Sequence, residues 1–437
     1  MDLILAFAVF AAAMIASRII SVTMILPLLL GLCAFSAVAL HRGYKLRNVL
    51  GMAIKGARGA GVVVVILLMI GCLTSLWRQS GTIACFTYYG VKLIPPRIFI
   101  LAAFLLTSVM SYALGTSFGV AATIGVILMT IARAGGVNTA WAAGAVMSGL
   151  YVGDRASPAS SSASLVAHET GTDVADNIRR MLRPSLVPLA LCVLLYGIIS
   201  LLSRSGEIDL TLLEGFGREF HLSLWCLLPT VLLLGMAFAR LNIRIVMAVN
   251  IVFSTILTVI VQDRSLIDVL RMTVMGFTPN DATLASLISG GGVKSMLEIV
   301  SMLLISSACT GIFAETGMLR GVETATARLC GRIGRFPAMA VVALGVSAVF
   351  CNQTIGAIMC RQIMGANYDD TPQGHIDLML DIENSVIVLA GLVPWCIACS
   401  VPMGMMGVGT ECLPFAFYLY LLPLCWWIKL KRSVTKS

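Results

Sequence analysis

Long stretches of apolar residues, separated by short polar or charged segments, run through nearly the whole chain. An α-helix rises about 1.5 Å per residue, so roughly 20 apolar residues cross the hydrocarbon core of a bilayer. Runs of this kind occupy residues 18–41, 58–78, 97–133, 184–204, 221–240, 244–263, 294–320, 335–361, 383–411 and 413–429. Some are long enough for two passes, or for one pass and a re-entrant hairpin. The pattern predicts an all-α, polytopic membrane protein with about 10–12 transmembrane helices.

The composition excludes a water-soluble protein. Of the 437 residues, 59% are hydrophobic and 12% are charged, about half the charged share that is usual in soluble domains. The first apolar run, residues 3–17, lacks a basic segment before it and a cleavage signal after it. We therefore expect a first membrane helix here, and not a removed signal peptide.

The net charge of +9 raises the question of nucleic-acid binding, but the basic residues gather in three short segments between apolar runs. These residues are His41, Arg42, Lys45, Arg47, Lys55 and Arg58, then Arg320, Arg328, Arg332 and Arg335, and finally Lys429, Lys431, Arg432 and Lys436. Basic residues accumulate in cytoplasmic loops and tails of membrane proteins. The distribution predicts the lipid bilayer as the partner, no nucleic acid, a location in the plasma membrane, and both termini in the cytoplasm.

Two parts of the chain resemble each other. Residues 74–83 read TSLWRQSGTI, and residues 310–319 read TGIFAETGML. Two more pairs follow in the same order, namely 108–119 with 347–356 and, more weakly, 141–158 with 376–394. Repeated halves with polar interruptions at matching positions are typical of secondary transporters, whose site lies where the repeats meet. We expect two inverted repeats with broken helices or re-entrant hairpins.

This interpretation divides the chain into five parts. They are N-terminal helices with a basic loop (1–59), a first repeat (60–203), connecting helices (204–280), a second repeat (281–403), and a final helix with a basic tail (404–437).

The segment at residues 149–173 carries the strongest chemical signal. Asp154 appears where hydropathy still favours the membrane, and Pro158 follows it. Proline breaks a helix, and a break at this depth must face protein or a wet cavity. Freed carbonyls and hydroxyls suit a hard cation such as Na⁺. The candidate ligands here are Asp154, Ser157, Ser160, Ser161, Ser162 and Ser164.

Asp154 is the sharpest single candidate, because an intramembrane carboxylate usually serves an ion or proton pathway. A buried carboxylate that binds either a proton or a cation is the simplest basis for cation/proton exchange. The alternative is that Asp154 pairs with the adjacent Arg155 or caps a helix near the interface.

Two further segments bear polar groups inside apolar runs. Glu383, Asn384 and Ser385 stand at the head of a run that Pro394 later breaks, so Glu383 joins Asp154 as a predicted Na⁺ ligand. The alternative is an ordinary helix start with an acidic first turn. The other candidates are Asn352, Gln353 and Thr354, which either line the site or link helices, and their weaker counterparts Thr116 and Ser117.

Several of these segments resemble the NhaC-type Na⁺/H⁺ antiporter family. GDRASPASSSASLVAHETGTD at 153–173 is similar to that family's GDKxSPLSDTTNLAxxxxGTD, and DIENSVIVLAGLVPW at 381–395 to LEDSGTxTSPLIPW. LPFAFYLYLLP at 413–423 looks like the closing helix, and the likeness extends from about Gly61 onward. The matching positions are Asp154, Ser157, Pro158, Gly171, Thr172, Asp173, Glu383, Ser385, Pro394 and Trp395.

The resemblance implies Na⁺/H⁺ antiport through two inverted repeats, and an elevator motion that relatives often perform as dimers, so a homodimer is an expected state. This chain departs from the family at Ser161 and Asn384, where the family has acidic residues, and at Ser164, where it has an amide. A site with fewer carboxylates should hold Na⁺ less strongly, or should take an anionic substrate. Relatives in this family exchange organic acids such as malate and lactate.

Two functions therefore remain open from the sequence. The first is Na⁺/H⁺ antiport across the plasma membrane, and the second is cation-coupled transport or exchange of a small organic acid or amino acid. We expect no enzymatic activity, because no nucleophile constellation, metal-ligand cluster or nucleotide loop is visible. No cofactor is expected either, and Na⁺ and H⁺ are the transported or coupling ions.

Overall fold

The computed structural model describes residues 2–20, 23–203, 210–239, 241–281, 284–285, 288–316 and 322–434. Helices dominate this part of the chain, and the only β-type pairing within it is an isolated bridge between Phe277 and Gly290. The predicted all-α membrane fold is confirmed. Residues 317–319, at the end of one predicted repeat segment, lie outside the described residues.

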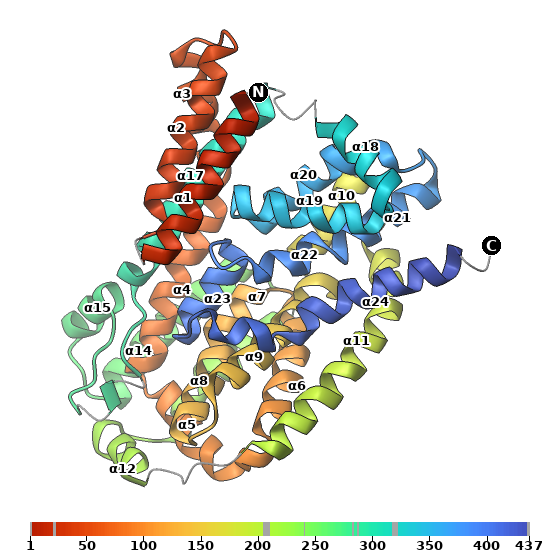
Figure 1. Cartoon of the computed structure of the whole chain (residues 1–437). Coiled ribbons are helices and arrows are strands. Elements are labelled where there is room, and N and C mark those ends of the chain that lie inside the picture. The colour runs from red at the N-terminus through yellow and green to blue at the C-terminus, as the bar shows by residue number, and fades with distance from the viewer. Residues whose placement is uncertain are drawn as a thin grey trace.

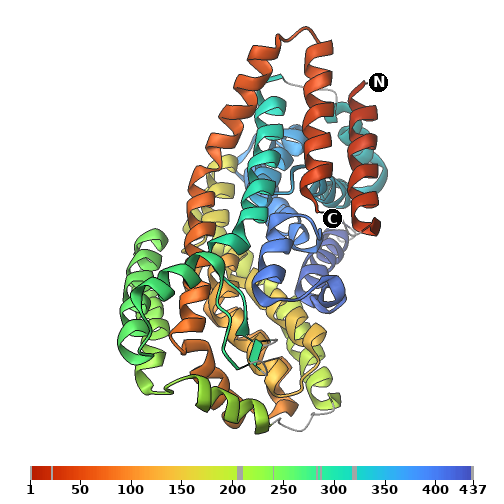
Figure 2. The same cartoon turned by 90° about the vertical axis from the view of Figure 1, so that its left-hand side faces the viewer.

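The N-terminal helices stand together with one helix from the second half of the chain. Helices α1 (Asp2–Ile20), α2 (Ile25–His41) and α3 (Leu46–Gly59) pack around α17 (Val293–Thr316). Figures 1 and 2 show this group protruding at one end of the molecule. An aromatic cluster fills its centre, where the Phe35 and Phe313 rings meet edge to face with centroids 4.8 Å apart.

The first half continues as a chain of helices, which is interrupted at residues 115–116 and again at residues 157–160. Its elements are α4 (Gly61–Gln79), α5 (Thr82–Leu93), α6 (Pro96–Leu114), α7 (Ser117–Val120), the π-helical turn η1 (Ala121–Gly125), α8 (Val126–Ala134), α9 (Thr139–Ala156), α10 (Ser161–Thr170) and α11 (Val174–Leu202). The connecting region holds α12 (Leu210–Glu219), η2 (Leu224–Leu227), α13 (Leu228–Phe238), α14 (Ile243–Val261) and α15 (Leu266–Met275).

The second half follows a similar order. After α17 come α18 (Val322–Ile333), α19 (Arg335–Phe350), α20 (Gln353–Met364), the turn η4 (Gly365–Asn367), α21 (Pro372–Glu383), α22 (Val386–Leu389), the turn η5 (Ala390–Leu392), α23 (Ile397–Met406), the turn η6 (Thr410–Phe415) and α24 (Phe417–Val434).

The two halves break at matching places with matching backbone conformations. Gly115 ends α6 in the left-handed region (φ 65°), and Cys351 ends α19 in the same region (φ 53°). The next residues, Thr116 and Asn352, are both extended and cap the following helix. A left-handed non-glycine residue costs free energy, so its presence at Cys351 indicates that the surrounding packing requires the break. That the halves are inverted relative to one another stays a prediction.

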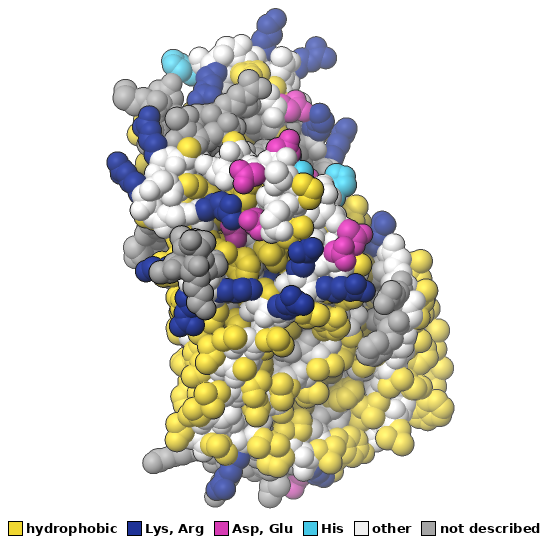
Figure 3. Space-filling model, turned by 90° about the vertical axis from the view of Figure 1, so that its right-hand side faces the viewer, with side chains coloured by type: hydrophobic (Ala, Val, Ile, Leu, Met, Phe, Trp, Pro, Cys, Tyr) yellow, Lys and Arg dark blue, Asp and Glu magenta, His cyan; other side chains and the backbone are white. Residues whose placement is uncertain are grey.

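Within the described residues, six helices are long and apolar enough to cross a membrane, or seven if the pair Pro372–Leu392 and Ile397–Met406, bent by 48°, forms one span. This number is below the predicted 10–12, because the interruptions divide several apolar runs into shorter helices such as Ile25–His41 and Arg335–Phe350. Figure 3 shows a broad hydrophobic surface below a charged region, with basic side chains along the boundary. That arrangement fits a bilayer around the apolar part.

Close packing of α9 against α6 brings the Asp154 segment to its place. These two helices form the most extensive helix pair of the described structure. Gly149 and Gly153, four residues apart on α9, face α6. A Cβ at Gly153 would overlap the carbonyl of Ser111 and the nitrogen of Tyr112. Small residues at this spacing let membrane helices approach closely, so the GLYVG sequence fixes the position of the residue that follows it.

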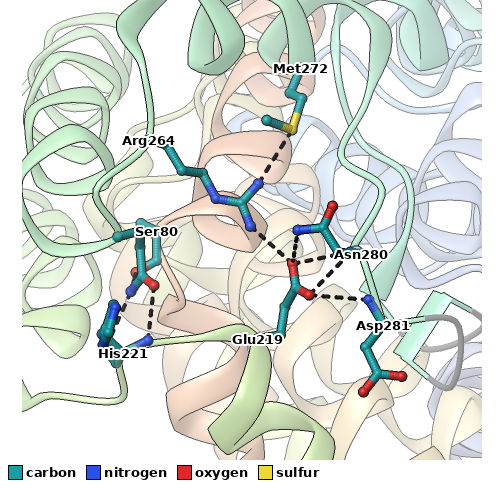
Figure 4. Close-up of polar contacts among 8 residues, drawn as sticks. Ser80, Glu219, His221, Arg264, Met272, Asn280 and Asp281 are labelled. Atoms are coloured by element: carbon teal, nitrogen blue, oxygen red, sulfur yellow. Dashed lines mark hydrogen bonds and ion pairs between the residues drawn. The ribbon is translucent and has the colours of Figure 1, made fainter.

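A buried acidic residue fastens the connecting region. One carboxylate oxygen of Glu219 forms an ion pair with Arg264 at 3.0 Å, and its side chain is 5% exposed. Glu219 also accepts hydrogen bonds from the backbone nitrogens of Asn280 and Asp281, each at 3.1 Å. Figure 4 shows how these groups surround the carboxylate. Gln262 accepts a hydrogen bond from the backbone nitrogen of His221 and donates one to the carbonyl of Ser80, so the ends of α4, α12 and α14 are held together.

We expect Glu219→Gln to lower the thermal unfolding midpoint in detergent by several degrees. Removing one partner of a buried ion pair costs about 3–5 kcal/mol, because the remaining charge is left uncompensated. Differential scanning fluorimetry of the purified protein measures the change. Glu214→Gln, on the exposed face of the same helix, is the matched control and should leave the midpoint unchanged. Equal midpoints for the two variants would show that the Glu219 network does not stabilise the fold.

Candidate functional site

The breaks in the two halves meet at one cavity of about 360 Å³, here called the Asp154 cavity. Most of its polar lining comes from three interrupted segments, whose residues are Thr116 and Ser117, then Asp154, Ser161 and Ser162, and finally Asn352, Gln353 and Thr354. The remaining wall includes apolar residues of α4 and the start of α23. Segments more than 200 residues apart in sequence thus supply one polar chamber.

Asp154 is held by groups from both halves of the chain. Asp154 is 4% exposed. One carboxylate oxygen accepts a hydrogen bond from the backbone nitrogen of Ser117 at 3.2 Å, and the other accepts one from Nε2 of Gln353 at 3.0 Å. Gln353 also donates to the carbonyl of Ile387 at 2.9 Å. A buried carboxylate with two donors keeps lone pairs available for a proton or a cation.

Several helices begin at the Asp154 cavity, namely the continuous segment 117–134, α10, α14, α20 and α23. Thr116 caps the continuous helical segment 117–134 by accepting from the nitrogen of Gly119 at 3.4 Å. Asn352 caps α20 by accepting from the nitrogen of Thr354 at 2.9 Å, and Ser160 caps α10 by accepting from that of Ala163 at 3.1 Å. Helix N-termini carry a partial positive charge. The chamber therefore combines the carboxylate of Asp154 with the partial positive charges of these helix starts and with the positive charge of Arg244, an exposed residue at the start of α14.

The second predicted acidic group lies behind the cavity. Glu383, Asn384 and Ser385 are fully buried and do not line the Asp154 cavity. Both carboxylate oxygens of Glu383 lack a hydrogen-bond partner among the described residues. Glu383 nevertheless interacts electrostatically with Arg155 and Asp154, so the two predicted Na⁺ ligands belong to one charge cluster although only Asp154 reaches the cavity.

The alternative pairing of Asp154 with Arg155 does not occur in the structure. Arg155 donates to Oδ1 of Asn384 and to Oγ of Ser185, each at 2.6 Å. Neighbouring residues on a helix point about 100° apart, which explains why Asp154 and Arg155 face different partners. Arg155 thereby links the break after α9 to the break after α21.

The predicted serines divide into two groups. Ser161 and Ser162 face the cavity. Ser157, Ser160 and Ser164 instead donate hydrogen bonds to backbone carbonyls near the break. Ser157 donates to the carbonyl of Tyr112 at 2.5 Å, Ser160 to that of Asp154, and Ser164 to that of Ser160 at 2.8 Å. Ser385 likewise donates to the carbonyl of Asp381 at 2.5 Å. These hydroxyls complete the interrupted helices, as a break inside a membrane requires.

Sequence reasoning missed two groups. Arg155 was considered only as a partner of Asp154, although helical geometry alone excluded that pairing. Asn242 and Arg244, at the start of α14, also line the Asp154 cavity. Their contribution comes from a helix of the connecting region, and no local motif in the sequence marks it.

The chain is similar in sequence to known transporters. The model of the Na⁺/H⁺ antiporter family matches residues 2–179 and 149–428, which extends the likeness well upstream of Gly61. The chain is 26% identical to the Na⁺/H⁺ antiporter NhaC of Bacillus subtilis, over 91% of this chain and 90% of that protein. It is 28% identical to NhaC of Alkalihalophilus pseudofirmus, over 82% and 79%.

Relatives of other specificity are similarly close. The chain is 25% identical to the malate-2H⁺/Na⁺-lactate antiporter of Bacillus subtilis, over 86% of this chain and 82% of that protein. These relatives are transporters and not enzymes. With a family model that covers nearly its whole length, and with a polar cavity at the meeting point of its broken membrane helices, this chain belongs to the Na⁺/H⁺ antiporter family.

Proposed function

We propose that this chain exchanges Na⁺ for protons across the membrane, with Asp154 as the carboxylate that binds the two ions in turn. The observation that carries the proposal is the buried Asp154, which faces a polar chamber and is held by Ser117 and Gln353 from the two broken segments. Na⁺ and H⁺ compete for one carboxylate, so binding of one releases the other. The names of the NhaC relatives support the same exchange.

The charges around the site suit a single exchanged cation. Asp154 and Glu383 contribute two negative charges when both are ionised, and Arg155 contributes one positive charge. The cluster then carries one net negative charge, which a single Na⁺ or a single H⁺ neutralises. Crossing an apolar barrier costs least when the moving group is neutral. The count covers the buried charges around Asp154, while the exposed Arg244 also lines the cavity; it supports exchange of one cation at that carboxylate.

The proposal is tested in proteoliposomes that enclose a pH-sensitive dye and carry an imposed proton gradient. Addition of Na⁺ should dissipate the gradient, while K⁺ at the same concentration should not, and empty liposomes should respond to neither. The apparent affinity for Na⁺ should decrease as the pH falls, because protons then occupy the shared carboxylate. A gradient that Na⁺ leaves intact at every pH would rule out this exchange.

A second carboxylate at the cavity should strengthen Na⁺ binding. Ser161 is exposed to the cavity at the first position of α10, where the resembling motif has Asp. We expect Ser161→Asp to lower the Na⁺ concentration for half-maximal exchange by about tenfold, since one added charge contributes more than 1 kcal/mol at an effective dielectric constant near 20. An acidic residue is favourable in the first turn of a helix, so the fold should tolerate it.

Ser164→Asp, one turn further along the same helix and outside the cavity lining, is the matched control. Dye-monitored exchange at a series of Na⁺ concentrations measures both variants. If Ser164→Asp strengthens Na⁺ binding as much as Ser161→Asp does, the effect is general surface charge and not coordination.

The convergence of several helix N-termini on the cavity favours a second candidate, exchange of a small organic acid. Partial positive charges at helix starts suit a substrate carboxylate. The relatives named as malate/lactate and arginine/ornithine antiporters show that substrates of this size occur among proteins similar to this chain. Counterflow of radiolabelled malate, lactate and arginine in the same proteoliposomes distinguishes this function from simple Na⁺/H⁺ antiport.

The cellular arrangement remains a prediction. We expect the chain in the plasma membrane with both termini in the cytoplasm, because basic segments of membrane proteins lie on the cytoplasmic side. We also expect the chain to form a homodimer. Cysteine accessibility from either side of the membrane and chemical cross-linking measure these two properties.

A further inference from the structure

A second cavity, of about 320 Å³, lies between α4, α8, α23 and the segment 289–299. Its charged lining groups are the guanidiniums of Arg78 and Arg133. Among the residues that the structure describes, no Asp or Glu lines this cavity, and neither arginine forms an ion pair with a described carboxylate. We call it the Arg78–Arg133 cavity.

The two arginines are only partly satisfied by the protein. Arg78 is 8% exposed and donates from Nη1 to the carbonyl of Thr74 at 2.9 Å. Its Nε is buried and has no hydrogen-bond partner among the described residues. Arg133 donates from Nη2 to the carbonyls of Met406 and Gly407, at 2.5 and 2.8 Å, where α23 ends. Those carbonyls offset part of the charge of Arg133, whereas the one described hydrogen bond of the Arg78 guanidinium goes to a carbonyl inside its own helix.

Both guanidiniums line the same cavity, so their like charges repel one another. A guanidinium does not lose its proton in a protein, so the repulsion is not relieved by deprotonation. Arg78 is buried and Arg133 is half-buried, and placing such cations beside an uncharged wall costs free energy unless an anion or further acceptors compensate them. The geometry therefore favours a negative charge inside this cavity.

The Arg78–Arg133 cavity lies at the other end of the helices that form the Asp154 cavity. On α4, Val62 and Ile66 line the Asp154 cavity, while Thr74 and Arg78 line the second one. Twelve residues separate Ile66 from Arg78, which is about 18 Å along a helix. α23 likewise begins at the first cavity and ends at the second. α4 has the length and composition of a membrane span, so the two cavities lie toward opposite ends of that span.

We propose that the Arg78–Arg133 cavity binds a small carboxylate anion from the aqueous phase. Arginine forks bind carboxylates through paired, charge-assisted hydrogen bonds, and the cavity volume suits an organic acid of a few carbon atoms. This site is separate from the proposed Na⁺/H⁺ exchange, since it shares no lining residue with the Asp154 cavity.

The test uses the purified full chain in detergent without Na⁺, with choline malate as the probe and choline chloride at equal ionic strength as the reference. Malate should raise the thermal unfolding midpoint, because a ligand that binds only the folded state stabilises it, and titration calorimetry should give its affinity. Arg78→Gln and Arg133→Gln should each weaken malate binding at least tenfold. Arg328→Gln, which removes an exposed arginine of α18, should leave malate binding unchanged.

Asp154→Asn separates this proposal from the proposed function, because it should retain the malate response even where Na⁺ exchange is lost. Ser289→Asp is a second test, whose result does not depend on whether the arginine variants fold. Ser289 is exposed and lines the cavity, so an aspartate there supplies the missing charge from the protein. It should raise the unfolding midpoint without malate and abolish the malate response.

Three results would overturn the proposal. Chloride that stabilises the protein as much as malate does would show a site without preference for carboxylates. A malate response that survives in both arginine variants and in Ser289→Asp would place the binding elsewhere. A response lost in Asp154→Asn and kept in the arginine variants would assign malate to the Asp154 cavity.

Discussion

Asp154→Asn is expected to reduce Na⁺-driven proton movement at least 100-fold while leaving the protein folded. Asparagine has nearly the shape of aspartate, and one amide oxygen can still accept the hydrogen bond from Ser117. The amide neither binds a proton near neutral pH nor attracts Na⁺ as a full charge does. Because the amide binds neither ion, the exchange itself is lost, and not only the affinity for Na⁺.

The measurement is dye-monitored proton flux in proteoliposomes, with the unfolding midpoint in detergent as a check on folding. Asp268→Asn, an exposed aspartate in the first turn of α15, removes the same charge away from the cavity and should transport normally. Asp154→Glu should keep measurable exchange, because it retains the carboxylate. If Asp154→Asn exchanges Na⁺ for protons at the parent rate, Asp154 is not the coupling group.

Gly153→Ala is expected to reduce transport at least tenfold and to lower the unfolding midpoint by several degrees. The added methyl group would overlap backbone atoms of Ser111 and Tyr112 on α6, which are not able to move aside as a flexible side chain can. Overpacking of this kind costs about 1–3 kcal/mol or more. The displaced helix would carry Asp154 with it, so its hydrogen bonds to Ser117 and Gln353 would lengthen.

Gly345→Ala is the control, because a Cβ at Gly345 on α19 meets no atom within 4 Å. Alanine favours a helix over glycine by about 1 kcal/mol, so this variant should be as stable as the parent or slightly more so. Transport and thermal unfolding are measured side by side for the two variants. Parent-like behaviour of Gly153→Ala would mean that α6 and α9 tolerate a wider separation than the structure indicates.

The sequence by itself determined the membrane fold and the segments where its helices break. Runs of about 20 apolar residues require a bilayer regardless of how they pack, and the break near Pro158 follows from the missing backbone donor of proline. The breaks before Thr116 and Asn352 are different. No proline marks them, and the sequence indicated them only through polar residues inside apolar runs.

Which of the predicted polar residues share a chamber was decided by the tertiary structure alone. Their positions inside apolar runs predicted Asp154 and Glu383 together as ligands. Only Asp154 faces the cavity, because Glu383 turns into the protein near Arg155. Local sequence does not specify the direction in which a side chain points after a break. That direction depends on how the next helices pack.

The pairing of Arg155 with Asn384 and the second cavity of Arg78 and Arg133 were likewise invisible in the sequence. Each joins residues more than 50 positions apart, and no periodicity or motif connects them. The local sequence pattern shows whether a segment favours lipid or water. Contacts between distant segments arise only when close packing of helices, as at Gly153, sets their mutual positions.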